Sequence, residues 1–317
     1  MEDHKARILI TAPWFTSLYL NKLKEHFIVD VNRMERWYTE DELSAMISNY
    51  DGIIAGLDPF TKDVLSKAKN LKIIARRGIG YDNIDLDYAC SHGIYVTNTP
   101  VPEEFDAVAE FTVALILSVI KNLYDAHDSL SKGSWERKSF IGRNLKDMTI
   151  GIIGLGNIGR RVALLLSSFG SKIIYYDSFV NDTVFQKVDL YELFKLSDII
   201  SVHLPLNKET MGLIDKKLLS SMKRGSYIIN TSRAEIINKD DLIWALDSGI
   251  IRYLALDVFY KEPPGLNDDI LRRKNVFATP HIAAYTTDAF NAIDRTCVNN
   301  IIKVLLYNEK PDYLLCK

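Results

Sequence analysis

The segment TIGIIGLGNIG, residues 149–159, carries the pattern GxGxxG between an apolar run and an amphipathic run. Residues 149–153 predict a strand that leads into the glycines, and the residues after the third glycine predict a helix with one apolar face. A second apolar run, 172–176, ends at Asp177. This order of strand, glycine turn, helix, strand and acid is typical of dinucleotide-binding units. A glycine-rich turn in an unrelated α/β domain would not need to be followed by such a helix, strand and acid.

Each part of the pattern has a physical reason. Gly154 permits a tight turn, Gly156 lets a pyrophosphate approach the backbone, and Gly159 lets the helix pack against the strand. The N-terminus of the helix presents amides without intrahelical partners to the phosphates. A carboxylate at Asp177 accepts hydrogen bonds from the ribose hydroxyls of NAD and repels the 2′-phosphate of NADP. The sequence therefore predicts NAD as the cofactor.

Short apolar runs alternate with amphipathic runs along the whole chain, which is typical of parallel α/β sheets. A chain of 317 residues is about twice the common domain length of ~150, so two domains are expected. A long helical run, 101–130, separates two series of strands, and the chain turns helical again after Pro280. The predicted strands are residues 7–11, 27–31, 52–55, 71–75, 95–97, 149–153, 172–176, 199–203, 227–230, 253–257 and 276–278.

Composition and charge exclude several classes of function. The 39 Lys and Arg residues nearly balance the 41 Asp and Glu residues, and this net charge of −2 argues against a nucleic-acid partner. The three cysteines, Cys90, Cys297 and Cys316, are far apart and form no CxxC pair, so we expect neither a zinc site nor disulfides. The charged N-terminus predicts no signal peptide, and the longest apolar run, 113–120, is shorter than the ~20 residues of a membrane span. We expect a cytoplasmic protein that binds a small molecule and no membrane.

Three segments end predicted strands with polar residues: INTSR at 229–233, LDVFYKEPP at 256–264 and ATPHIAA at 278–284. Ligands of open α/β sheets bind beyond the carboxyl ends of the strands, so these segments are the candidate site. In this order after GLGNIG, they resemble the D-isomer-specific 2-hydroxyacid dehydrogenases. RRGIGYDNID at 76–85 resembles the substrate-carboxylate loop of that family, and VAE at 108–110 resembles a signature in its linking helix.

The resemblance covers nearly the whole chain and implies its architecture. The fold class is then α/β, with a Rossmann-type NAD-binding domain inserted into a flavodoxin-like α/β substrate domain. The implied boundaries are 1–99 plus 288–317 for the substrate domain and 100–287 for the NAD-binding domain. The family also implies a homodimer that forms through the linking helix region, 101–131.

The resemblance implies NAD-dependent interconversion of a small 2-hydroxy acid and its 2-keto acid. His281 would be the general acid, since histidine exchanges protons near neutrality, and Glu262 would hold the far nitrogen of its ring. Arg233 would bind the substrate carboxylate and polarise the carbonyl, for which a planar guanidinium is well suited. The amides of Ile79 and Gly80 would donate further hydrogen bonds to the carboxylate. No metal is implied.

The implied contacts with NAD come from several strand ends. His203 is interpreted as a packing residue or adenosine contact, and not as an acid. The implied set is Val108, Gly154, Gly156, Asn157, Ile158, Gly159, Asp177, His203, Leu204, Pro205, Thr231, Ser232, Arg233, Asp257, His281 and Ala283.

The chain also departs from the family pattern. Ala234 and Glu235 follow the arginine where a glycine is common, and Glu104 replaces a common asparagine. Arg77, beside Arg76, either reads a second anionic group of the substrate or is an exposed arginine without a role. Two other functions stay open: oxidation of phosphite by the same Arg, Glu and His, and an NADH-sensing dimeric co-regulator with little catalysis.

Overall fold

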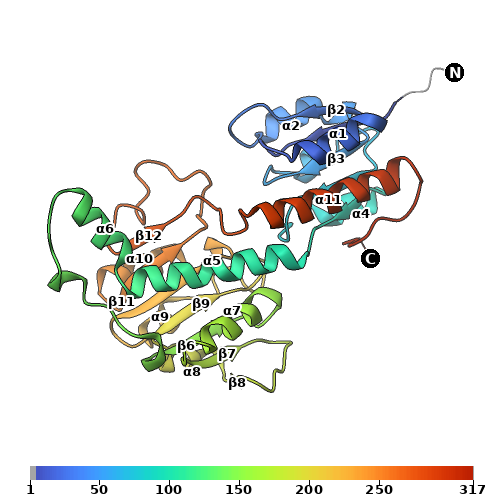
Figure 1. Cartoon of the computed structure of the whole chain (residues 1–317). Coiled ribbons are helices and arrows are strands. Elements are labelled where there is room, and N and C mark those ends of the chain that lie inside the picture. Colours follow the sequence, from blue (N-terminus) through green and yellow to red (C-terminus); the bar gives the residue numbers. More distant parts are fainter. Residues whose placement is uncertain (1–4, 317) are drawn as a thin grey trace. The chain divides into compact units, whose positions relative to one another are not determined.

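The structure is a computed structural model that describes residues 5–316, and it divides into two compact units. The terminal unit contains the residues up to Glu104 together with those from Thr286 onward, and the central unit is Phe105–Tyr285. Both units contain a sheet whose strand pairs, where described, are all parallel. The predicted parallel α/β class is confirmed, and helices cover both sheets in Figure 1.

The terminal unit has a five-stranded sheet in the order β2-β1-β3-β4-β5. Its buried strands carry continuous apolar residues, as in β3, where the sequence is GIIA, because both faces of a parallel sheet are covered. Helix α11 packs on β3 and β4, and so brings the C-terminal part of the chain onto the N-terminal sheet. The elements are β1 Arg7–Ile10, α1 Ser17–His26, β2 Ile28–Val31, α2 Glu40–Met46, β3 Gly52–Ala55, α3 Lys62–Leu65, β4 Ile73–Arg76, α4 Leu86–Ser91, β5 Tyr95–Thr97 and α11 Thr287–Leu305.

The central unit has a seven-stranded sheet in the order β12-β11-β10-β9-β6-β7-β8. One buried cluster joins a face of this sheet to α5 and α7 through residues such as Ile116 and Leu166. Another joins the sheet to α8, α9 and α10 through residues such as Leu193 and Leu242. The elements are α5 Pro102–Ile120, α6 Leu123–Ser131, β6 Thr149–Ile153, α7 Asn157–Ser167, β7 Lys172–Tyr176, β8 Gln186–Lys187, α8 Leu190–Leu196, β9 Ile199–Val202, α9 Lys216–Ser220, β10 Ser226–Asn230, α10 Lys239–Asp247, β11 Ile251–Leu256 and β12 Val276–Ala278.

The predicted helical run 101–130 is broken. Helix α5 ends at Ile120, and α6 begins at Leu123 after a bend of 63°. Asn122 lies at the break with a φ of 52°, a left-handed conformation that asparagine adopts more readily than most residues. Apolar spacing alone continues through this residue and does not reveal the break. Within residues 5–316, no single helix is long and apolar enough to cross a membrane, and only this bent pair passes that test together.

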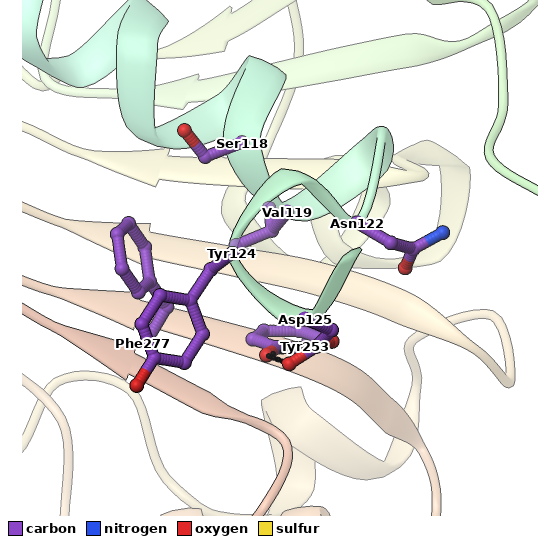
Figure 2. Close-up of a pocket in the computed structure, with 7 residues that line it drawn as sticks. All are labelled: Ser118, Val119, Asn122, Tyr124, Asp125, Tyr253 and Phe277. Atoms are coloured by element: carbon purple, nitrogen blue, oxygen red, sulfur yellow. Dashed lines mark hydrogen bonds between the residues drawn. The ribbon is translucent and has the colours of Figure 1, made fainter. Parts of the chain in front are cut away.

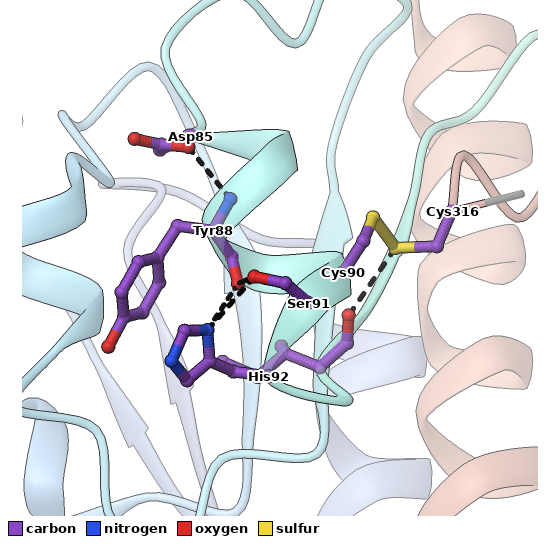
Figure 3. Close-up of a disulfide and its surroundings, with 7 residues drawn as sticks. Asp85, Tyr88, Cys90, Ser91, His92 and Cys316 are labelled. Atoms are coloured by element: carbon purple, nitrogen blue, oxygen red, sulfur yellow. Dashed lines mark hydrogen bonds between the residues drawn. A yellow bond between two sulfur atoms is a disulfide. The ribbon is translucent and has the colours of Figure 1, made fainter.

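The prediction that the cysteines are unpaired is wrong for two of them. Cys90 in α4 and Cys316 form a disulfide across a sequence separation of 226 residues, with their Cα atoms 5.4 Å apart (Figure 3). The C-terminal segment returns to the edge of the sheet, where Leu314 forms an antiparallel bridge with Thr97. The amide of Leu315 also donates to the carbonyl of Val96 at 2.8 Å. This return brings the cysteines together, and their spacing in the sequence cannot show it.

Candidate active site

The glycine turn in the central unit has the geometry that its residues predict. Gly154 has a φ of 89°, and a Cβ there would lie 2.6 Å from the carbonyl oxygen of His203. A Cβ on Gly159 would collide with the carbonyl oxygen of Gly154, so α7 could not pack as closely on β6. A Cβ on Gly156 would meet open space beside the first turn of α7. That space, next to helix amides without intrahelical partners, fits the pyrophosphate of a dinucleotide.

Asp177 lies directly after β7 and is 8% exposed. One of its carboxylate oxygens accepts from the amide of Leu155 at 2.7 Å, which ties the end of β7 to the glycine turn. The other accepts from the amides of Phe179 and Val180, both at 2.8 Å. The carboxylate is therefore fixed beside the glycine turn, and it has lone pairs in addition to these for the hydroxyls of a ribose.

The three predicted catalytic residues follow neighbouring strands of one sheet. Arg233 follows β10, Glu262 follows β11 and His281 follows β12, and these strands are adjacent in the order β12-β11-β10. The carboxyl ends of parallel strands lie at the same edge of a sheet. The sheet therefore brings an arginine, an acid and a histidine to one edge of the central unit.

His281 and Glu262 are in direct contact. The Nδ1 atom of His281 lies 2.7 Å from Oε2 of Glu262, and the two side chains are 29% and 25% exposed. The amide of Phe259 donates to Oε1 of Glu262 at 3.1 Å, so both carboxylate oxygens are engaged. With Nδ1 held in this way, His281 would exchange a proton with a substrate through Nε2. A carboxylate at Nδ1 also stabilises the charged ring.

Asp257, at the end of β11, holds the loop that carries His281. It is fully buried, and one oxygen accepts from the Thr279 hydroxyl at 2.6 Å and from the Ile282 amide at 2.9 Å. The other accepts from the Ala283 amide at 2.7 Å. Burial raises the pKa of Asp257, while these three donors favour its charged form. The resemblance implied a contact with NAD for this residue, and its positioning of the histidine loop was missed.

Asn230 holds the loop that carries Arg233. Its side-chain Oδ1 accepts from the backbone amide and the hydroxyl of Ser232, at 2.9 and 2.7 Å. Its side-chain Nδ2 donates to the Arg233 carbonyl at 2.8 Å. The Thr231 hydroxyl lies 2.9 Å from the Thr112 hydroxyl of α5. Thr231 and Ser232, which are predicted to contact NAD, thus lie in a loop that these hydrogen bonds hold in place.

The remaining predicted cofactor residues also belong to the central unit. The Nε2 atom of His203 lies 2.8 Å from the Ser201 hydroxyl, and burial lowers the pKa of His203 to about 3. Its ring is therefore neutral near pH 7 and is not a general acid. Val108 in α5 and Ala283 are buried, and the carbonyl of Pro205 accepts from the Thr210 hydroxyl at 2.6 Å.

The predicted carboxylate loop belongs to the terminal unit. Gly78 has a φ of 143°, and a Cβ there would lie 2.6 Å from Nη1 of Arg76. The Asn98 side chain donates to the Ile79 carbonyl at 2.8 Å. Arg77 is not the exposed arginine that one interpretation predicted, because its side chain is 6% exposed and pairs with Asp294 at 2.5 Å between Nε and Oδ1. The turn at 76–79 therefore contains one partner of a buried ion pair.

A small hollow lies elsewhere in the central unit, at the break between α5 and α6 (Figure 2). The hydroxyl of Tyr253 donates to Asp125 across it, at 3.1 Å to each carboxylate oxygen. Arg233, Glu262 and His281 do not line this hollow, so it is separate from the candidate active site. Its lining residues are Ser118, Val119, Asn122, Tyr124, Asp125, Tyr253 and Phe277.

Comparison with known proteins now identifies the family. The family model described as "D-isomer specific 2-hydroxyacid dehydrogenase, NAD binding domain" matches residues 113–283. The chain is 39% identical to a glyoxylate reductase of Thermofilum pendens, over 94% of this chain and 91% of the relative. The chain belongs to the D-isomer-specific 2-hydroxyacid dehydrogenase family.

Further relatives agree with this assignment. A hydroxypyruvate reductase of Thermotoga maritima is 40% identical, over 92% of this chain and 94% of the relative. A crystal structure of an Aquifex aeolicus D-lactate dehydrogenase with NAD and lactic acid matches this chain with a TM-score of 0.87 and 30% sequence identity. The match covers 98% of this chain and 99% of the chain in that crystal structure. This D-2-hydroxyacid dehydrogenase is accordingly an NAD-dependent oxidoreductase that acts on a CH–OH group, and the predicted Rossmann-type fold and NAD cofactor are confirmed.

Proposed function

We propose that this enzyme interconverts a small 2-hydroxy acid of D configuration and its 2-keto acid, with Arg233, Glu262 and His281 as its catalytic residues. The observation that carries the proposal is the contact of 2.7 Å between His281 and Glu262, at the same sheet edge as Arg233. Bound NAD supplies the acceptor, and NADH the donor, of the hydride that moves to or from the C2 atom of the substrate.

The side chains of this chain divide the remaining chemistry. In reduction, protonated His281 gives its Nε2 proton to the carbonyl oxygen, and the carboxylate of Glu262 stabilises the charged ring before that transfer. Arg233 binds the substrate carboxylate and draws electron density from the carbonyl. In oxidation, neutral His281 accepts the hydroxyl proton at the same atom. Ile79 and Gly80, in the terminal unit, are the proposed amide donors to the substrate carboxylate.

The cofactor contacts follow from the same turn and strand ends. We propose that the amides of Asn157 and Ile158, at the start of α7, bind the pyrophosphate, and that Asp177 binds the adenosine ribose. His203, Leu204 and Pro205 are proposed to line the adenosine.

The names of the relatives indicate which substrates to test. Glyoxylate and hydroxypyruvate come first, because relatives at 39% and 40% identity are named as their reductases. Phosphite belongs in the same panel, because its oxidation would use the same Arg, Glu and His. A co-regulator with little catalysis would bind NADH but turn over none of these compounds.

The decisive variant is His281→Ala. We expect at least a thousandfold loss of turnover with unchanged affinity for NADH, because general acid–base catalysis contributes about 10² to 10⁴ in rate and the imidazole also orients the carbonyl. His26→Gln is the matched control, since it removes an exposed histidine of α1. Activity retained in His281→Ala and equal to that of His26→Gln would refute the proposed mechanism.

We also propose a homodimer that forms through region 101–131, in the cytoplasm. The support is the surface of α6, where Leu123, Tyr124 and Leu130 are each more than half exposed. Isolated apolar side chains are common on surfaces, but three on one short helix favour an interface. Sedimentation of the wild type and of Leu130→Asp tests this, and a wild type that is monomeric at micromolar concentration contradicts it.

A further inference from the structure

Glu104 is an acid in the interior of the terminal unit. It lies in the first turn of α5, where the family commonly has asparagine, and it is only 6% exposed. Its Oε2 atom lies 3.5 Å from the Thr99 hydroxyl, and the Thr99 amide donates to the carbonyl of Gly78 at 3.1 Å. The buried carboxylate therefore lies beside the loop whose Ile79 and Gly80 amides are proposed to bind the substrate carboxylate.

The charges that face Glu104 come from two other elements. Arg76 and Arg77, at the end of β4, are the cations that act on its carboxylate. Arg77 is already paired with Asp294 of α11, which is fully buried and also accepts from the amide of Thr16 at 3.0 Å. The thiol of Cys297, also in α11, is buried, and its burial raises its pKa, so that it adds no charge near neutral pH. Arg76, whose Nη1 also donates to the Arg77 carbonyl, is the cation that acts more strongly on the Glu104 carboxylate.

A second carboxylate at this loop creates a conflict of charge. A substrate anion that binds the Ile79 and Gly80 amides would come close to the Glu104 carboxylate, which is itself buried. Two carboxylates that share such a site do not both ionise, because the repulsion between them is weakly screened there. One of them must take up a proton, and the substrate is the stronger acid of the two, because an α-keto or α-hydroxy group withdraws electrons.

We propose that Glu104 is a positioning residue that must be neutral for the substrate carboxylate to bind, so that each substrate anion enters with uptake of a proton by Glu104. This inference rests on the proposed function, because it uses the proposed role of the 78–80 loop. A neutral Glu104 side chain keeps its proton and carries no charge that repels the incoming carboxylate.

The environment of Glu104 sets the pH range of this effect. Burial raises the pKa of Glu104 to about 7, against the lowering by Arg76 and the Ile79 amide. Below that pH the side chain is neutral and the substrate binds without a further proton. Above it the carboxylate is ionised, and each pH unit weakens substrate binding by about tenfold, because one proton is linked to binding.

The experiment measures KM and kcat for oxidation of a D-2-hydroxy acid by saturating NAD between pH 6 and pH 9, in the wild type, Glu104→Gln and Glu103→Gln. Oxidation is chosen because its proton acceptor is the neutral ring of His281, whereas reduction needs the protonated ring. We expect KM to rise about tenfold per pH unit above 7 in the wild type and to stay flat in Glu104→Gln. Glu103→Gln, which removes a more exposed acid one residue away, should follow the wild type.

A second measurement covers the case in which Glu104→Gln does not fold. Titration of the His281→Gln enzyme and NADH with oxamate, in buffers of different ionisation enthalpy at pH 8, counts the protons taken up without the contribution of the imidazole. We expect uptake of close to one proton. The inference is overturned, and the proposed function is not, if Glu104→Gln turns over substrate with the same dependence of KM on pH as the wild type. Binding of oxamate without proton uptake has the same consequence. A wild type that turns over no 2-hydroxy or 2-keto acid refutes the proposed function and this inference with it.

Discussion

The two units hold their functional loops by different means. In the central unit, buried Asp257 fixes the loop of His281 through hydrogen bonds to groups 22 to 26 residues further along the chain. Buried Asn230 fixes the loop of Arg233 through hydrogen bonds to residues two or three positions away. In the terminal unit, Arg77 of the loop at 76–79 forms a buried ion pair with Asp294. A disulfide between Cys90 and Cys316 fixes the C-terminal segment of the same unit. The hydrogen bonds of the central unit do not depend on redox conditions. The stability of the terminal unit should depend on both partners of the ion pair and on the oxidation of its disulfide.

The largest effect is expected from breaking the ion pair. Asp294→Ala leaves the Arg77 guanidinium buried without its counter-ion, which typically costs about 3 to 5 kcal/mol in free energy of unfolding. Denaturant unfolding measures this loss. Asp128→Ala is the control, because its pair with Lys132 on α6 is exposed and such pairs contribute about 0 to 1 kcal/mol. Equal losses in the two variants would show that the buried pair does not stabilise the terminal unit.

The disulfide is expected to contribute somewhat less. Cys90→Ser should lower the free energy of unfolding by about 2 to 4 kcal/mol under oxidising conditions. A reducing agent should remove most of this difference, because the wild type then loses the same link. Cys297→Ser is the control for loss of a thiol, as Cys297 is free and buried. If a reducing agent leaves the wild-type transition unchanged, the link between α4 and the C-terminal segment is not stabilising.

The smallest effect is expected in the central unit. Asp257→Asn keeps the size of the side chain but replaces one acceptor oxygen by a donor, so it can no longer accept from all three groups of the histidine loop. A shift of about 1 Å in a catalytic group costs up to 10²-fold in rate, so kcat should fall by about 10- to 100-fold. The unfolding transition should change less than in Asp294→Ala. An unchanged kcat would show that Asp257 does not position His281.

The same contrast explains how much could be predicted from the sequence. The glycine turn, Asp177 and the order of Arg233, Glu262 and His281 could be predicted, because each motif is short and its geometry is set by neighbouring residues. The disulfide could not, because it depends on the return of the chain to β5.

Two other features also escaped prediction, for local reasons. The break at Asn122 depends on the backbone conformation of one residue, which periodic apolar spacing does not report. The position of the Glu104 carboxylate beside the 78–80 loop was visible only as a departure from the family pattern. Sequence reasoning could mark that position as unusual, but burial of the carboxylate is a property of the folded terminal unit.

The most direct test of the account is the stereochemistry of the product when the purified enzyme reduces hydroxypyruvate and glyoxylate with NADH. Hydroxypyruvate gives a chiral product, and chromatography on a chiral phase measures both enantiomers while absorbance follows the NADH consumed. We predict one D-glycerate formed per NADH oxidised, together with oxidation of NADH by glyoxylate. Formation of the L enantiomer, or no product from any 2-keto acid tested, would contradict the account.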